Sequence, residues 1–284
     1  MIQHALASED GPILLILQSD LSLNEVHAHW LCNFGAIYHN HQRIRSSDMT
    51  IKKGDYLRVH SIPRRFPVEH SNWKSCVLAE TNDFVVINKP FGIPTHATVD
   101  NLFENAAHQI SLALNTPIYV THRLDVATSG ILLLAKTKEL QRQFNFALQD
   151  GLVEKTYVAT VSGHLTKTGL IEHFMETSNY LPKQISSTAV EGWRPCLLEI
   201  LQTQAQDENS QVIIRLITGR THQIRAQMSA LGHPVLGDRL YTGDVSLRKL
   251  PWGQIEKIEL KARSLKFKLN RSAEAPEYFY SIEN

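Results

Sequence analysis

Two charged side chains stand two residues apart in the segment His122-Arg123-Leu124-Asp125, and together they could carry out chemistry. In an extended backbone, residues two apart project to the same side, so Arg123 and Asp125 are expected to face one space while Leu124 turns away. A neighbouring guanidinium lowers the pKa of a carboxyl group and keeps it ionised, which suits a nucleophile or an electrostatic stabiliser. A structural ion pair at the start of a strand is the alternative interpretation, because such pairs perturb pKa values without function.

A second polar cluster lies in segment 218–225, TGRTHQIR, where a predicted strand passes through a glycine turn into a predicted helix. The backbone N–H groups at such a helix start, together with Arg220, are suited to hold an anion such as a phosphate. Arg225 directly follows the apolar Ile224 and is expected to point inward, where it needs a carboxylate partner; Asp125 is the candidate. A solvated arginine on an ordinary amphipathic helix is the alternative.

Tyr157 is an aromatic residue on a predicted strand over residues 155–161. On its own it is interpreted as a core tyrosine whose hydroxyl finds a partner, which is the commoner fate of a strand tyrosine. Closely spaced histidines occur within residues 27–41, but no carboxylate or cysteine stands at a ligand spacing from them. No metal site is therefore expected.

The elements that must position these residues belong to a chain of ordinary globular composition, with 284 residues, 43% of them hydrophobic and 20% charged. A net charge of +1 gives no global basic signal, so any nucleic-acid binding must come from local patches. Three widely spaced cysteines suit a reducing cytoplasm better than a disulfide framework. No apolar run is long enough for a signal-peptide core or a membrane span, so a cytoplasmic protein without membrane contact is expected.

The pattern of strands and helices predicts two parts, a small N-terminal module over residues 1–67 and a main domain over residues 68–284. Prolines and an arginine pair mark the linker between them. In the main domain, strands and helices do not alternate strictly, which favours a mixed α+β sheet over a parallel βαβ fold. Helices are predicted to begin near Asn101, with Glu104 completing a capping box, after Thr137 and near Thr221. Strands are predicted at 84–87, 131–135, 155–161, 211–217 and 260–267.

Taken together, the polar clusters resemble the pseudouridine synthases of the RluA family, which act on ribosomal and transfer RNA. The resemblance spans roughly residues 77–267, and several motifs in one order are far more specific than any one of them. The motifs are KPFG (89–92), HRLDVATSG (122–130), KTY (155–157), GRTHQIR (219–225) and GHPVLGDRLY (232–241).

The resemblance implies a pseudouridine synthase fold, with a mixed, largely antiparallel central sheet, flanking helices and a central RNA-binding cleft. It implies that Asp125 is the catalytic aspartate and that Arg225 pairs with it. Tyr157 would stack on the target uracil and act as a base, and Arg123 would meet the RNA near the vacated base position. The further substrate-binding residues implied by the motifs are Lys89, His122, Thr128 and Arg220.

The implied reaction isomerises uridine in ribosomal or transfer RNA to pseudouridine, and uracil is both its leaving group and its nucleophile. No metal, redox cofactor or nucleotide is therefore expected. An ionised Asp125 could trap the anomeric carbon covalently or stabilise its positive charge. Elimination across the ribose, with Tyr157 or Asp125 taking a proton, is the competing route. Because a paired base is out of reach, the uridine must flip out of its helix.

The N-terminal module resembles the second half of the small alpha-L RNA-binding motif, in a degenerate form, over residues 34–59. Its function as an RNA-binding or as a packing module stays open, and a monomer is expected. Two other functions compete with the isomerase. A non-catalytic RNA-binding protein would not need Asp125, Tyr157 and Arg225 together. A nucleoside hydrolase would be expected to show an aspartate-rich metal site, which the sequence does not display.

Overall fold

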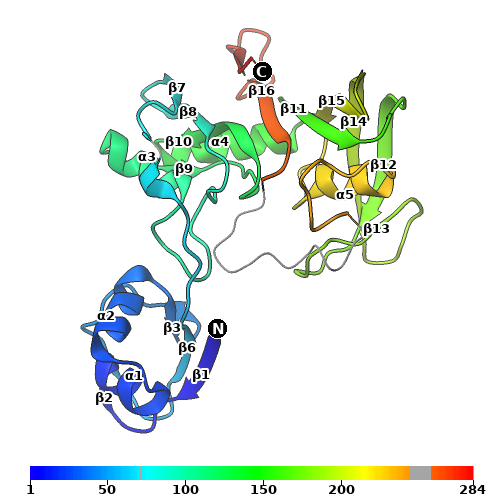
Figure 1. Cartoon of the computed structure of the whole chain (residues 1–284). Helices are drawn as coiled ribbons and strands as arrows, with labels where there is room; N and C mark the ends of the chain where they lie inside the picture. The colour runs from blue at the N-terminus through cyan, green and yellow to red at the C-terminus, as the bar shows by residue number, and fades with distance from the viewer. Residues whose placement is uncertain (71, 243–256, 284) are drawn as a thin grey trace.

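The computed structural model describes residues 1–70, 72–242 and 257–283 and divides into a small N-terminal module and a larger domain (Figure 1). The larger domain is built on one sheet of eleven strands within this described part of the chain. Its elements, in chain order, are β7 (Val77–Glu80), β8 (Phe84–Lys89), α3 (Ala106–Leu114), β9 (Tyr119–Val120), β10 (Ser129–Ala135), α4 (Lys138–Gln149), β11 (Val153–Ser162), β12 (Gly169–Met175), β13 (Ile185–Ser186), β14 (Arg194–Gln206), β15 (Asn209–Leu216), α5 (Gln223–Ala230), β16 (Leu260–Phe267) and β17 (Tyr278–Ser281).

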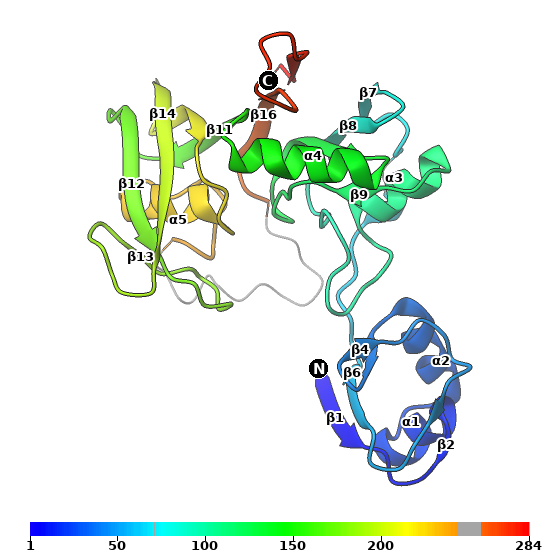
Figure 2. The same cartoon turned by 180° about the vertical axis from the view of Figure 1, so that it is seen from behind.

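The sheet is mixed and largely antiparallel, so the predicted α+β class is confirmed. Its strand order is β13-β12-β14-β15-β11-β16-β10-β8-β7, with β9 and β17 paired to β10 and β16. Only the pairing of β10 with β16 is parallel among the described strands. Strand β16 therefore joins two halves of the sheet, one ending at β10 and the other at β11, and Figure 2 shows these halves on either side of it.

The two faces of the sheet are covered by different helices because its strands alternate apolar side chains between them. On β8, Val85 and Ile87 belong to the large core cluster that also contains apolar residues of α3 and α5. The intervening Phe84 and Val86 pack with Phe144 of α4 in a second cluster. The predicted cap of α4 is confirmed, because Oγ1 of Thr137 accepts a hydrogen bond from the backbone N–H of Leu140 at 3.1 Å.

The N-terminal module has its own four-stranded sheet, ordered β1-β6-β3-β4, and its own apolar cluster. Helix α2 ends at Phe34 because Gly35 takes the left-handed conformation, with φ 74°. The elements of the module are β1 (Ile2–Leu6), β2 (Gly11–Pro12), α1 (Ile13–Leu21), α2 (Glu25–Phe34), β3 (Ile37–His39), β4 (Gln42–Arg43), β5 (Thr50–Ile51) and β6 (Tyr56–His60).

The helix predicted from Asn101 begins later than expected, at Ala106, and its N-cap is Asn105. Asn101 does accept a hydrogen bond from the backbone N–H of Glu104 at 2.9 Å, as in a capping box. The carboxylate of Glu104 instead binds the linker, accepting hydrogen bonds from Arg65 and from the backbone N–H of Phe66, both at 2.7 Å. The pattern therefore marks an anchor for the linker and not a helix start. None of the helices in the described ranges is long and apolar enough to cross a bilayer.

Candidate active site

A cavity of about 810 Å³ lies where the two halves of the sheet meet. It receives side chains from the loop before β10, from β11, and from the loop that leads into α5. The residues predicted for the site that line it are His122, Arg123, Asp125, Thr128, Tyr157, Arg220 and Arg225. The structure thus brings together seven of the eight residues singled out in the sequence, from segments more than 90 residues apart.

The loop that carries Asp125 is fixed on both sides by buried contacts. The hydroxyl of Thr95 accepts a hydrogen bond from the backbone N–H of Leu124 at 3.0 Å and donates one to its carbonyl at 2.9 Å. The backbone N–H of Thr128 donates to the carbonyl of Asp125 at 3.1 Å and closes a turn. Arg123 is exposed to the cavity while Leu124 is buried in the core, as expected for alternating side chains.

The carboxyl group of Asp125 sits deep in the cavity, with 27% of its side chain exposed. Burial raises its pKa above the usual aspartate value, while the charges of Arg225, Arg123 and Lys89 act in the opposite direction. The expectation of a lowered pKa was wrong because it counted the nearby guanidinium but not the loss of water. The site therefore holds a carboxyl group that is both surrounded by cations and costly to ionise.

Arg225 points inward, as predicted, and is only 3% exposed. The carboxylate that forms its ion pair belongs to Asp238 and not to Asp125, which corrects the predicted partner. Its Nε donates to Oδ2 of Asp238 at 2.6 Å and its Nη2 donates to Oδ1 at 2.8 Å. This two-pronged pair fixes the guanidinium plane. The positive charge of Arg225 is nevertheless the largest influence that lowers the pKa of Asp125.

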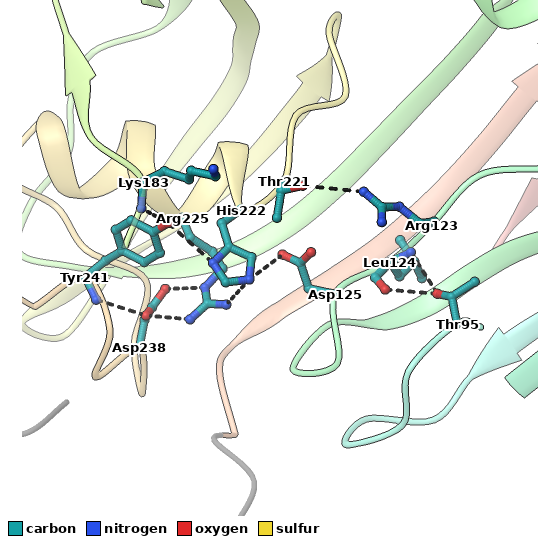
Figure 3. A network of polar contacts seen from close by, with 10 residues as sticks. All are labelled: Thr95, Arg123, Leu124, Asp125, Lys183, Thr221, His222, Arg225, Asp238 and Tyr241. Atoms are coloured by element: carbon teal, nitrogen blue, oxygen red, sulfur yellow. Dashed lines mark hydrogen bonds and ion pairs between the residues drawn. The ribbon is translucent and has the colours of Figure 1, made fainter. Parts of the chain in front are cut away.

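His222 connects Arg225 with Tyr241, as Figure 3 shows. Its Nε2 lies 3.3 Å from Nη1 of Arg225, and a guanidinium can only donate, so this nitrogen is the acceptor. Its Nδ1 therefore carries the proton and lies 3.3 Å from the hydroxyl of Tyr241. Burial and the charge of Arg225 lower the pKa of His222 to about 3, which keeps the ring neutral. Its Nε2 lies 3.9 Å from Oδ2 of Asp125.

Tyr157 lies on β11 and is 6% exposed. Burial and the negative charge of Asp125 raise the pKa of its hydroxyl above the usual tyrosine value. The phenol therefore stays protonated at neutral pH. Such a group is suited to donate a hydrogen bond, and it is a poor proton acceptor.

Lys89 differs from its expected place, because its side chain is completely buried and does not line the cavity. Its ammonium donates to the carbonyls of Pro90 at 2.9 Å and Ile93 at 2.7 Å. Burial lowers its pKa to about 7, against the opposing influence of Asp125. A residue with no exposed surface cannot contact RNA directly, so Lys89 acts on the site only through its charge and its hold on the backbone.

His122 lines the cavity but also supports β10, where its Nε2 accepts a hydrogen bond from the backbone N–H of Leu133 at 3.2 Å. Burial lowers its pKa to about 3, so the ring is neutral. Lys155, which stands in the KTY motif but was not predicted as a site residue, lines the same cavity, and its ammonium group has no hydrogen bond or ion pair within the described ranges. Burial lowers its pKa as well.

Other site residues escaped the sequence argument because their role depends on tertiary contacts. Gln223 holds the turn before α5: its Oε1 accepts hydrogen bonds from the hydroxyl of Thr218 at 2.8 Å and the backbone N–H of Arg220 at 3.0 Å. Asp238 and Tyr241 lie in the motif at 232–241, but nothing in that motif alone shows that they meet Arg225. No group of three or more acidic, histidine or cysteine side chains that could hold a metal ion is found in the described residues.

Comparisons with known proteins find related sequences and folds. The family model for RNA pseudouridylate synthase matches residues 83–230. RNA pseudouridine synthase 6, chloroplastic, of Oryza sativa subsp. japonica is 34% identical over 223 residues, covering 70% of this chain and 46% of that protein. The uncharacterized RNA pseudouridine synthase YhcT of Bacillus subtilis (strain 168) is 31% identical over 220 residues, covering 73% and 71%. This chain thus spans about half the length of the plant relative.

The solved structure of Human RNA Pseudouridylate Synthase Domain Containing 1 is also similar, with a TM-score of 0.56 and 28% sequence identity. The alignment covers 73% of this chain and 82% of that one. The match of the family model to more than half of the chain, the similar relatives and the shared fold lead to one assignment: the chain belongs to the RluA family of RNA pseudouridylate synthases.

Proposed function

We propose that this protein isomerises uridine to pseudouridine in RNA, with Asp125 as its catalytic carboxylate. The observation that carries the proposal is the position of Asp125 in a cavity of about 810 Å³, between Arg123 and Arg225 and near Tyr157. The cavity is roughly as large as pockets that enclose small ligands, so it can take a flipped nucleoside. Family membership supports the reaction.

In this proposal the bond between N1 of uracil and the ribose breaks, the uracil turns, and its carbon 5 joins the ribose. Carbon 5 then loses its proton and N1 gains one, so no electrons or atoms are gained or lost overall. Asp125 either bonds to the anomeric carbon and leaves again when carbon 5 attacks, or it removes a ribose proton in the elimination route and returns it after the new bond has formed. Because its pKa is raised, the carboxylate of Asp125 takes up a proton more readily than the carboxylate of an exposed aspartate does. Tyr157 serves as the platform under the uracil, and its protonated hydroxyl donates a hydrogen bond to the departing base. This assignment replaces the role of Tyr157 as a base.

The remaining parts of the proposal concern the partner and the setting. Ribosomal or transfer RNA is the proposed substrate; the name of one relative, the Ribosomal large subunit pseudouridine synthase D of Yersinia pestis, supports the ribosomal alternative. We further propose a cytoplasmic monomer in which residues 1–67 form a degenerate alpha-L module and residues 68–284 carry out the reaction.

The test maps pseudouridine in cellular RNA with and without the gene, and after restoring either the wild type or Asp125→Asn. We expect one or a few uridines to lose the modification without the gene and to regain it only with the wild type. Asp125→Asn keeps the shape of the side chain and removes its charge, so its folding and RNA affinity should stay close to wild type. Restoration of the modification by a folded Asp125→Asn protein would refute the role of Asp125, and an unchanged map would refute the reaction.

A further inference from the structure

A second cavity opens beside the pocket of Asp125, and we propose that it binds a phosphodiester of the RNA strand next to the target uridine. This inference rests on the function proposed above. The second cavity has a volume of about 290 Å³ and shares Arg220 and Thr221 with the larger one. A strand that places its uridine near Asp125 can therefore continue past these two residues into the smaller cavity.

Among the residues that the structure describes, three cationic side chains line the smaller cavity, those of Lys183, Arg194 and Arg220. The one carboxylate in this described lining, Glu176, is already engaged by local contacts. Its oxygens accept hydrogen bonds from the backbone N–H of Gln184 and from the hydroxyl of Ser178, both at 2.8 Å. The cavity therefore carries a surplus of positive charge, which suits an anionic ligand.

Several hydrogen-bond donors in this cavity have no acceptor of normal geometry among the described residues. In the ranges that the structure describes, the guanidinium of Arg194 makes no hydrogen bond or ion pair. Within the same ranges, the Nε of Arg220 is buried without a partner, and its Nη2 reaches only the carbonyl of Pro195 at 3.5 Å. Buried donors are normally satisfied, so an unused one beside two other cations points to a ligand oxygen. Guanidinium groups bind phosphate oxygens with paired hydrogen bonds.

The cations form a continuous path from one cavity to the other. Arg123 lies at the larger cavity, and its Nη2 is 3.4 Å from the hydroxyl of Thr221, one of the two residues common to both cavities. Arg220, Arg194 and Lys183 continue the path. A row of positive groups matches the repeating charge of a nucleic-acid backbone better than it matches a single free anion.

The test measures the binding of a short oligouridylate with a 5′ fluorophore by fluorescence anisotropy over a series of KCl concentrations. The variants are Arg194→Ala and Lys183→Ala, with Arg194→Lys and Lys183→Arg to keep the charge. Arg142→Ala and Lys167→Ala are the matched controls, because both side chains are exposed and line neither cavity. Each alanine variant should weaken binding roughly fivefold at low salt and reduce the slope of log Kd against log [KCl] by about 0.7. Thermal melting confirms folding.

Alanine variants that match the controls would overturn the phosphodiester site, and so would charge-keeping variants that bind as weakly as alanine. Displacement of the oligouridylate by inorganic phosphate at constant ionic strength, in the wild type but not in Arg194→Ala, would assign the cavity to a free anion instead. A failure of the proposed function would give a different pair of results. The variants would bind the oligouridylate as expected, while the pseudouridine map of cellular RNA would stay the same without the gene.

Discussion

Opposing influences act on the carboxyl group of Asp125, because burial raises its pKa while three cations lower it. One of the three, Lys89, never meets solvent and is held by two backbone carbonyls. Its position makes it a regulator of the charge at Asp125 and not an RNA ligand. The motif that contains Lys89 is visible in the sequence, but its burial depends on how β8 and the loop after it pack.

Lys89→Met should move the acid limb of the pH profile to higher pH. Asp125 must be ionised to act, so activity is lost as the pH falls through its raised pKa. The ammonium of Lys89 opposes that rise, and it is charged below its own pKa of about 7. Its removal therefore raises the pKa of Asp125 further. The measurement is kcat/KM on RNA as a function of pH, with the exposed Lys138→Met as control. Coinciding acid limbs in the wild type and Lys89→Met would contradict this coupling.

Tyr157→Phe should keep RNA affinity and lower turnover about 100-fold, since loss of one hydrogen bond to the charge that develops on the departing base typically costs about that much. The ring remains as a platform, and only the hydroxyl is lost. Tyr157→Ala should lower both, because stacking on a base is worth ~1–3 kcal/mol. Turnover, RNA affinity and melting temperature are measured on both variants. If Tyr157 were only a core residue, Phe would leave turnover unchanged and Ala would affect mainly the melting temperature.

At the scale of the elements, the loop of Asp125 depends on a close approach of two strands. Gly130, the second residue of β10, has φ 111° and lies opposite Ala262 of β16. A Cβ atom at Gly130 would stand 2.2 Å from the carbonyl oxygen of Ala262. Only glycine allows both this conformation and this distance. The first turn of the chain into β10 is thereby fixed at Gly130, close after the loop that carries Asp125.

Gly130→Ala should lower the free energy of unfolding by at least about 2 kcal/mol, since backbone strain and a steric clash combine. Gly151→Ala is the control, because Gly151 also has a positive φ, of 71°, but nothing lies within 4 Å of its added Cβ. That control should cost about 1 kcal/mol. Denaturant unfolding compares the two variants, and equal losses would show that the strand approach carries no special constraint.

Local elements were predictable where the signal was local, and tertiary partners were not. The cap at Thr137 and the strand over 260–267 follow from residue type and spacing, and the structure confirms them. The partner of Arg225 depends on where the loop after α5 returns, which no spacing reveals. Strand β14 lies between these two cases, because only its first half has the alternating pattern of a half-buried strand. Its alternating Cys196, Leu198 and Ile200 are buried, but most of its second half is exposed and polar.

At the scale of the whole molecule, the N-terminal module has an apolar cluster of its own and is joined to the larger domain by an anchored linker. Among the described residues, this cluster shares no buried residue with the cores of the larger domain. The linker is held by two carboxylates of the larger domain, because Asp100 binds Arg64 and Glu104 binds Arg65. Both carboxylate side chains are only 8% exposed. We therefore expect the stability of the larger domain to depend more on the linker than on the rest of the module.

A chain that starts at Ile62 should have a melting temperature close to that of the larger domain in the full protein. A chain that starts at Val68 should have a melting temperature at least about 5 °C lower. The shorter chain leaves Asp100 and Glu104 without their arginine partners, and an unpaired buried charge is costly. Calorimetry measures both. Glu104→Gln in the shorter chain should recover part of the loss because no charge remains there. Equal melting temperatures for the two chains would show that the anchor contributes nothing.

The central place of β16 has a consequence for how the protein is made. Strand β16 follows Asp125, Tyr157 and Arg225 in the sequence, yet it lies between β10 and β11, and so between the half of the sheet next to Asp125 and the half that carries Tyr157 and Arg225. A ribosome therefore delivers β16 after these three residues have been made. The two halves of the sheet cannot be joined through β16 until residues 260–267 have left the ribosome, so we expect the cavity around Asp125 to be completed by a strand that is made after the residues it brings together.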